Sequence, residues 1–277
     1  MPRDFMSFWR ELSYLARLGG GLGDSVRLPW ASVRFHAANS LGLSKHLLDR
    51  PPESFRLNLL GRGYPIRLRP HNGDWFIFLN TMFGRRYAPV AQLVNPIQTV
   101  IDLGCHVGSS TLSLALLAPQ AQFFCLEANP ANVALLTHNL AGLGSQVKIL
   151  SGALGEKPGT VTFSDDGFSW GGSVDAHGLH TYEVPAYTIS QVIEKAGFPI
   201  VDVLKVHVEG AERYILQESQ RAALTRVRLM VIAEFHDADY TEERFLADAA
   251  GFGFQPVCGK QFRDRFLALV NCSLASP

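Results

Sequence analysis

Two segments in the second half of the chain place ionisable side chains where they could carry out acid–base chemistry. In LKVHVE, the strand period of two puts Lys205, His207 and Glu209 on one face. A strand in a parallel sheet is normally apolar on both faces, so three ionisable side chains on one face suggest a functional role. On the next expected strand, Glu234 and His236 share a face in the same way. We expect both groups near the carboxyl edge of a sheet, where α/β proteins bind ligands.

A glycine turn earlier in the chain has the spacing of a nucleotide-binding unit. In TVIDLGCHVGSSTLSLALLAPQAQFFCLEAN, an apolar strand leads to Gly104 and Gly108, and a helix and a second strand follow. That second strand ends at Glu127, 23 residues after Gly104. An acidic side chain binds a ribose at an offset of about 20 residues in such units. The glycines let the backbone approach a ligand closely.

Asp102 narrows the kind of nucleotide that this turn would bind. It lies two residues before the first glycine, in a DxGxxxG pattern that differs from the GxGxxG of dinucleotide sites. A carboxylate there would oppose a pyrophosphate but suits a cationic or zwitterionic ligand. S-adenosylmethionine has a sulfonium, an ammonium and a ribose. We expect Asp102 to help hold its amino acid end, directly or through water, and Glu127 to bind its ribose.

Four segments resemble a known family. VIDLGCHVGSSTLSLA, CLEANPAN, SGALGE and above all DVLKVHVEGAERYIL are similar to the FkbM family of S-adenosylmethionine-dependent methyltransferases, over roughly residues 64–253. The resemblance implies a class I methyltransferase fold, a Rossmann-like, doubly wound, mostly parallel sheet of seven strands with an antiparallel last strand. It also implies methylation of an acceptor, usually a hydroxyl on a natural product or a sugar.

The same resemblance implies which residues bind the cofactor. The expected positions, with Gly152 and Ala153 near the adenine, are Asp102, Gly104, His106, Gly108, Ser109, Glu127, Ala128, Asn129, Gly152 and Ala153. The chain departs from the family at two places. His207 stands where the family usually has Asp, and His106 stands where Asn is common.

A hydroxyl acceptor must lose a proton as its oxygen attacks the methyl group. His207 is the first candidate for the base, because an unperturbed imidazole pKa of about 6.5 suits proton abstraction near neutrality. Glu209 would then orient His207 or the substrate, and His236 with Glu234 is the competing pair. A structural role for His207, hydrogen-bonded in the core to Lys205 or to a carboxylate, stays open.

Other chemistry stays open too. The same two histidines and two glutamates have the residue types of a divalent metal site, although a metal-free site is preferred. A carboxylate or amine acceptor would relax the need for a base. From other classes, a non-catalytic or NAD-binding Rossmann-like protein is the alternative.

Composition limits the partners of this 277-residue chain. Lys plus Arg equals Asp plus Glu at 25 each, so no global field favours nucleic acid or an anionic membrane, and a small-molecule acceptor is expected. Hydrophobic residues make up 47%, which suits a large α/β domain. The four cysteines form no CxxC pattern and indicate free thiols in a reducing compartment. We expect a cytoplasmic protein with no transmembrane segment.

The N-terminal part is expected to be a helical extension over residues 1–63. Residues 4–18 have apolar side chains at helical spacing, and Gly19 to Gly21 end the helix. The apolar stripe is expected to pack on its own domain. A homodimer contact is the second choice, and membrane-surface binding is the least favoured because basic residues are few.

The methyltransferase domain is expected over residues 64–277. A hairpin at 64–80, with strands 64–68 and 75–80 around the Asn72–Gly73 pair, leads into the core at 98–277. Strands at 99–103, 122–126 and 147–150 alternate with helices, which predicts parallel pairing with right-handed crossovers. The loop 164–182, with Phe168 and Trp170, is expected to be a lid or binding loop. Two antiparallel strands, 254–257 and 266–270, close the chain.

Overall fold

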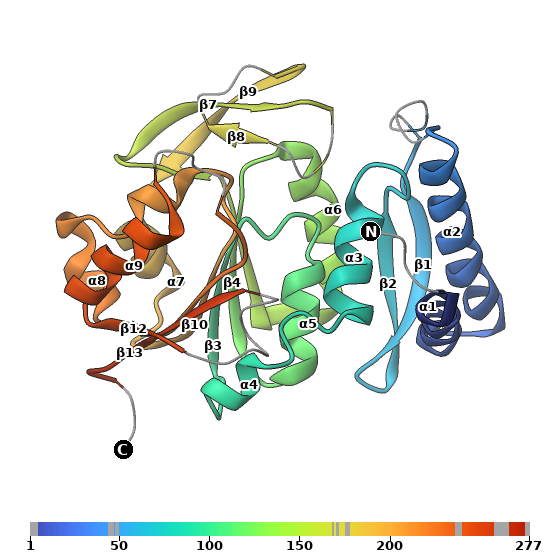
Figure 1. Ribbon diagram of the computed structural model, residues 1–277, viewed down its shortest axis with the longest axis horizontal. Coiled ribbons are helices and arrows are strands. Elements are labelled where there is room, and N and C mark those ends of the chain that lie inside the picture. Colours follow the sequence, from blue (N-terminus) through green and yellow to red (C-terminus); the bar gives the residue numbers. More distant parts are fainter. Residues whose placement is uncertain are drawn as a thin grey trace.

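The computed structural model describes residues 5–43, 47, 50–167, 169, 172–174, 178–235, 240–257 and 266–274. A seven-stranded sheet lies at the centre with helices on both faces, and a four-stranded sheet lies above one of its edges (Figure 1). The N-terminal helices and a hairpin lie at one side. Among the described helices, none is both long and apolar enough to cross a membrane.

The central sheet has the strand order β12-β13-β11-β10-β3-β4-β5. Its strands are β3 (Thr99–Leu103), β4 (Gln122–Glu127), β5 (Val147–Ser151), β10 (Val201–Val206), β11 (Val227–Ile232), β12 (Phe254–Pro256) and β13 (Leu267–Asn271). The strands from β11 to β5 are parallel, whereas β13 is antiparallel to both β11 and β12. This confirms the class I methyltransferase fold, including the antiparallel last strand and the closing antiparallel pair.

Alternating side chains of the central strands build two apolar layers. Val100 and Phe123 belong to the cluster on one face, and the adjacent residues Ile101 and Phe124 belong to the cluster on the other. The first face is covered by α4 (Val90–Leu93), α5 (Ser109–Leu117) and α6 (Pro130–Leu140), and the second by α7 (Ile189–Ala196), α8 (Arg221–Leu224) and α9 (Glu242–Gly251). A sheet buried on both faces fixes the positions of its strand ends.

The four-stranded sheet has the order β6-β9-β7-β8. Its strands are β6 (Ala153–Leu154), β7 (Gly159–Asp165), β8 (Ser173–Val174) and β9 (His180–Tyr187). The predicted loop 164–182 is therefore shorter than expected, because β7 and β9 pair as far as Asp165 and His180. Phe168 and Trp170 of that loop lie outside the described residues.

The N-terminal part contains a helical pair followed by a hairpin. Its elements are α1 (Phe5–Leu18), α2 (Leu22–Ser40), β1 (Glu53–Leu59), β2 (Arg62–Leu68), α3 (Asp74–Phe78) and a π-helical turn (Leu79–Phe83). The helix expected at 4–18 is present. The predicted boundary between residues 63 and 64 falls inside β2.

The hairpin predicted at residues 64–80 is wrong. Residues 62–68 pair instead with the preceding strand β1, across a turn at Leu60 and Gly61, where φ is +51° and +74°. Alternate residues of both strands are buried, as a half-buried hairpin requires. The segment expected as the second strand is helical in α3, and Trp75 and Phe78 bury on one face of it.

Candidate active site

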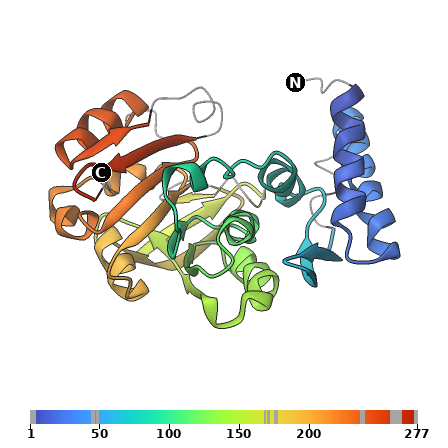
Figure 2. The same cartoon turned by 90° about the horizontal axis from the view of Figure 1, so that it is seen from below.

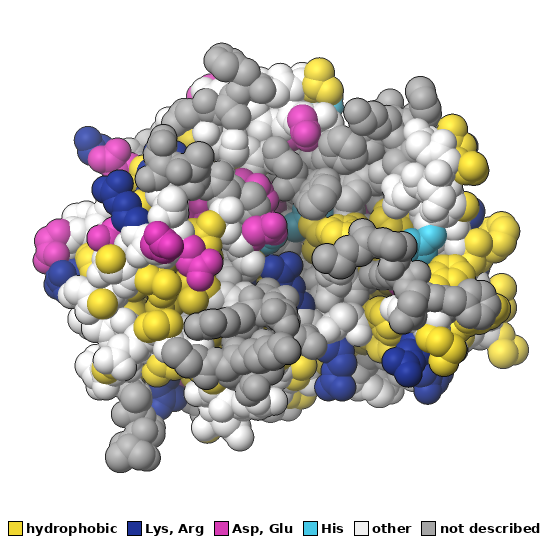
Figure 3. Space-filling view, viewed as in Figure 1, with side chains coloured by type: hydrophobic (Ala, Val, Ile, Leu, Met, Phe, Trp, Pro, Cys, Tyr) yellow, Lys and Arg dark blue, Asp and Glu magenta, His cyan; other side chains and the backbone are white. Residues whose placement is uncertain are grey.

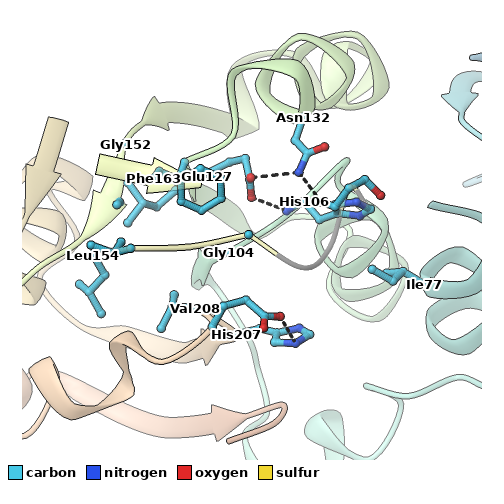
Figure 4. A pocket seen from close by; sticks show the side chains of 17 residues that line it. Ile77, Gly104, His106, Glu127, Asn132, Gly152, Leu154, Phe163, His207 and Val208 are labelled. Carbon is cyan, nitrogen blue, oxygen red and sulfur yellow. Dashed lines mark hydrogen bonds and ion pairs between the residues drawn. The ribbon is translucent and has the colours of Figure 1, made fainter. Parts of the chain in front are cut away.

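A pocket opens where β3, β4 and β10 end, beneath the four-stranded sheet (Figure 4). It holds about 630 Å³ of space, including its open mouth. The side chains and backbone that form its walls come from the turns after these strands, from the segment β6 to β8, and from α3 and α6. The polar and glycine residues in the wall are Gly104, His106, Glu127, Asn132, Gly152, Ser169, Gly172, His207 and Glu209.

The glycine turn is tightly packed against the end of β10. Gly104 has φ +67°, and a Cβ there would lie 1.7 Å from the carbonyl oxygen of His207. The backbone N–H of His207 donates to Leu103 O at 3.1 Å. Gly108, with φ +95°, is the N-cap residue that precedes α5. Only glycine permits this approach, so the turn and His207 are held at fixed positions.

Glu127 has hydrogen bonds to both carboxylate oxygens and still faces the pocket. Its Oε2 accepts from the backbone N–H of His106 at 2.8 Å. Its Oε1 accepts from the N–H of Asn129 at 3.0 Å and from Nδ2 of Asn132 at 3.2 Å. A carboxylate offers about four acceptor positions, so Oε2 keeps one for a further donor such as a ribose hydroxyl. Figure 4 shows the Glu127 carboxylate pointing toward Asn132 and the His106 segment.

Asp102 and Lys205 form a buried ion pair beneath the glycine turn, outside the pocket wall. Asp102 Oδ1 lies 2.8 Å from Lys205 Nζ, and its Oδ2 accepts from the hydroxyls of Ser110 and Thr111. Lys205 Nζ also donates to Gly104 O at 2.7 Å. Burial alone would lower the pKa of Lys205, but the adjacent Asp102 carboxylate holds this pKa above its usual value. The pair therefore supports the turn from below.

Some of the other residues predicted to bind the cofactor line the pocket, and the others lie at the starts of the helices beside it. Ala128, Gly152 and Ala153 line the pocket. Asn129 instead caps α6, because its Oδ1 accepts from the N–H of Ala131 at 2.9 Å. Ser109 is buried at the start of α5.

His207 lies between two carboxylates at the carboxyl edge of the sheet. Its Nε2 is 3.4 Å from Glu209 Oε1 and 3.7 Å from Glu234 Oε2. His207 and Glu209 both line the pocket, whereas Lys205 does not. Glu209 has φ +48°, an uncommon conformation for a residue with a side chain. His236, predicted as a competing base, lies outside the described residues.

A polar network that the sequence reasoning missed connects the hairpin to Glu127. Arg69, at the end of β2, donates through Nε and Nη2 to both oxygens of Asp74 at 2.9 Å, and Nη2 also donates to Asn132 Oδ1. Nε2 of His106 lies 3.1 Å from Asp74 Oδ1. Asp74 stands in the HNGD turn and Asn132 in NPAN, but neither segment indicated that the two would share a partner.

Asp74 is the most strongly perturbed member of this network. Its burial raises its pKa, but His106 and Arg69 outweigh burial and lower the pKa to about 2. Asp74 is therefore a carboxylate at neutral pH, fixed between two side chains that belong to other elements.

The described residues contain no group of three or more His, Cys, Asp and Glu side chains arranged to hold a metal ion. The four-residue metal site considered above includes His236, which is outside that part of the chain.

Comparisons with known proteins place these features in a family. The model of the methyltransferase FkbM domain matches residues 102–262. The 2-O-methyltransferase NoeI of Sinorhizobium fredii (strain NBRC 101917 / NGR234) is 25% identical over 171 residues, which cover 55% of this chain and 69% of NoeI.

Two solved structures have a similar chain course. Methyltransferase FkbM from Methylobacillus flagellatus KT is 13% identical, with a TM-score of 0.45, and the match covers 97% of this chain and 59% of that chain. TrmK from M. capricolum, solved in complex with S-adenosyl-homocysteine, is 11% identical, with a TM-score of 0.39 and 68% of each chain covered.

Proposed function

Because the chain belongs to the FkbM methyltransferase family, we propose that it transfers a methyl group from S-adenosylmethionine to a hydroxyl of a small molecule, such as a sugar or natural product. Family membership supports methyl transfer over the NAD-binding and non-catalytic alternatives. The observation that carries the choice of a hydroxyl is the position of His207, in the wall of the same pocket as Glu127, with two carboxylates beside its Nε2.

The pocket residues fit S-adenosylmethionine. Glu127 has one acceptor position left for a ribose hydroxyl, and the glycine turn brings backbone to the pocket wall. Leu154, Phe163 and Val174 give an apolar wall that suits an adenine ring. Buried Ser109 Oγ lacks a hydrogen-bond partner among the described residues, at the start of α5. When bound, S-adenosylmethionine supplies an electrophilic methyl group on its sulfonium.

His207 is the proposed base for the acceptor hydroxyl. Its imidazole receives the proton as the acceptor oxygen attacks, and the carboxylates of Glu209 and Glu234 stabilise the resulting imidazolium. Alignment of the acceptor supplies most of the remaining acceleration, as expected for an in-line displacement. Ile77 and Ser169, from α3 and from the segment between β7 and β8, are in the wall and would shape the acceptor site.

The similarity to NoeI, which is a 2-O-methyltransferase, supports an oxygen acceptor.

The test is incubation of the purified protein with methyl-labelled S-adenosylmethionine and a panel of sugars, carboxylic acids and amines. We expect label in a product that survives mild alkali, as a methyl ether does and a methyl ester does not. Label only in esters or amines, or no S-adenosyl-homocysteine formed with any acceptor, would contradict the proposal.

A further inference from the structure

The two N-terminal helices present apolar side chains to solvent. They lie side by side at the outer edge of the molecule, away from the central sheet (Figure 2). Leu22 is 91% exposed and Trp30 is 58% exposed on α2, and Trp9 is 52% exposed on α1. Figure 3 shows hydrophobic side chains along this edge, over α1 and α2. Two exposed tryptophans on one pair of packed helices are unusual on a surface that is only solvated.

Three exposed apolar side chains form one continuous row on α2. Leu22, Val26 and Trp30 recur at every fourth residue, so they lie in one row on the helix surface. The buried residues of α2, such as Leu28 and Ala31, lie on the opposite side and pack into the core. The helix therefore has two apolar faces: one packs into the core of its own domain, and the exposed row does not.

The exposed charged side chains that the structure describes on α1 and α2 are all basic. Arg10 and Arg17 of α1 and Arg27 of α2 are exposed. The acidic side chains described between residues 5 and 69 are not exposed, and each has a basic partner. These pairs are Glu11 with His36, Asp24 with Arg27, and Glu53 with Arg34.

The net charge of zero for the whole chain conceals an excess of basic residues in its first part. Residues 1–69 contain 11 Lys and Arg and five Asp and Glu, whereas the remaining chain contains 14 and 20. The formal charge is therefore +6 for the first part and −6 for the second. The sequence-based argument against a membrane surface counted basic residues only within the first helix, whereas the count over residues 1–69 is 11.

We propose that the exposed face of α1 and α2 binds the surface of an anionic lipid bilayer. Trp and Leu side chains would enter the boundary between headgroups and acyl chains, and the arginines would contact anionic headgroups. A second copy of this chain fits less well, because it would bring arginines against arginines. Nucleic acid would satisfy the arginines but leave Leu22 and Val26 without an apolar partner.

The test is co-sedimentation of the full chain with vesicles of phosphatidylcholine alone, or of equal parts phosphatidylcholine and phosphatidylglycerol. We expect binding to the anionic vesicles, a blue shift of tryptophan fluorescence, and weaker binding at high salt. Arg10→Gln with Arg17→Gln should weaken binding by about fivefold per arginine. Trp30→Ser should weaken it on the order of tenfold. Lys148→Gln with Lys157→Gln, two exposed lysines outside α1 and α2, is the matched control and should bind as the wild type does.

Three results would overturn the proposal. The first is no preference for anionic vesicles. The second is a dimer in sedimentation velocity that Trp30→Ser dissociates, which would assign the face to a homodimer. The third is binding of RNA or DNA that the arginine substitutions abolish and Trp30→Ser leaves intact. Equal thermal midpoints of wild type and variants show that a loss of binding is not a loss of folding.

Discussion

Asp102 is the residue whose removal should change the site most, although it acts from beneath the pocket. Asp102→Ala leaves Lys205 Nζ buried without its carboxylate, and Lys205 also donates to Gly104 O. We expect the free energy of unfolding to fall by about 3–5 kcal/mol, as when one partner of a buried pair is removed. Calorimetry should find that S-adenosylmethionine binding is lost, because the glycine turn is no longer supported.

The control for this variant also removes the positive charge of Lys205, which Asp102→Ala leaves buried without its partner. Adding Lys205→Met to Asp102→Ala should recover part of the stability in urea titrations, since two apolar side chains can replace a buried ion pair. Unchanged cofactor affinity in Asp102→Ala would contradict the supporting role proposed for Asp102.

His207 tests the chemistry separately from cofactor binding. His207→Ala should lower turnover by about 10²–10⁴-fold, the usual contribution of a positioned base, with little change in the affinity for S-adenosylmethionine. Single-turnover methyl transfer and calorimetry on the same preparation measure the two effects. Glu234→Gln, which keeps the shape of a neighbour 3.7 Å away, should have a smaller effect. Full activity in His207→Ala would move the base role to His236 or to no residue.

The sequence pattern predicted Lys205, His207 and Glu209 on one strand face. It did not indicate that Lys205 would be buried in an ion pair while His207 and Glu209 line the pocket. Lys205 pairs with Asp102 because β10 lies beside β3, where the two residues are in register. His207 and Glu209 follow the end of β10 and reach the pocket. Strand order is a tertiary property, and no local pattern in either segment specifies it.

At the scale of elements, Asp74 joins three parts of the chain. It binds Arg69 at the end of β2 and His106 in the glycine turn, while Arg69 binds Asn132 on α6. The hairpin and α3 therefore help to position the α6 side chain that donates to Glu127. We expect Asp74→Asn to weaken cofactor binding as well as folding.

The pH dependence of Asp74→Asn follows from the lowered pKa. The carboxyl of Asp74 binds its proton less readily in the folded state, with a pKa of about 2, than in the unfolded chain, where it is near 4. Its stabilisation, about 2–3 kcal/mol, is therefore complete above the unfolded-state pKa near 4 and lost as the pH falls through about 2. Urea titrations should show wild type and Asp74→Asn differing at pH 7 and converging at low pH. The exposed substitution Glu156→Gln should give no such difference.

Most helices and strands whose apolar residues recur with a clear period were predicted correctly, and each of the missed elements was missed for a physical reason. The segment from β3 to β5 alternates apolar strands with helices, so its pattern specifies parallel pairing. The hairpin was misplaced because the sequence from Trp75 to Phe78 is apolar at every position, and such a short run does not distinguish a strand from a helix. Its partner strand β1 was missed because Glu53–Leu59 follows two prolines that read as a break.

At the scale of the whole molecule, the extension and the domain share one apolar core. Leu15 of α1 and Leu28 of α2 are fully buried in the same cluster as Trp75, Leu114 and Phe123. A division at residue 63 would treat the extension as a separate unit, yet this cluster crosses that position without interruption. We therefore expect the two parts to fold as one cooperative unit.

Leu28→Ala tests this cooperativity, because it removes a buried side chain of the extension alone. We expect a loss of about 2–5 kcal/mol in the free energy of unfolding of the whole chain. Circular dichroism, which follows all helices and strands, and tryptophan fluorescence, which follows Trp9, Trp30 and Trp75 among others, should give one coincident transition in urea for wild type and variant. Leu22→Ala, at a position 91% exposed, should change the midpoint little. A fluorescence transition that precedes the circular dichroism transition in Leu28→Ala would instead show that α1 and α2 unfold separately from the methyltransferase core.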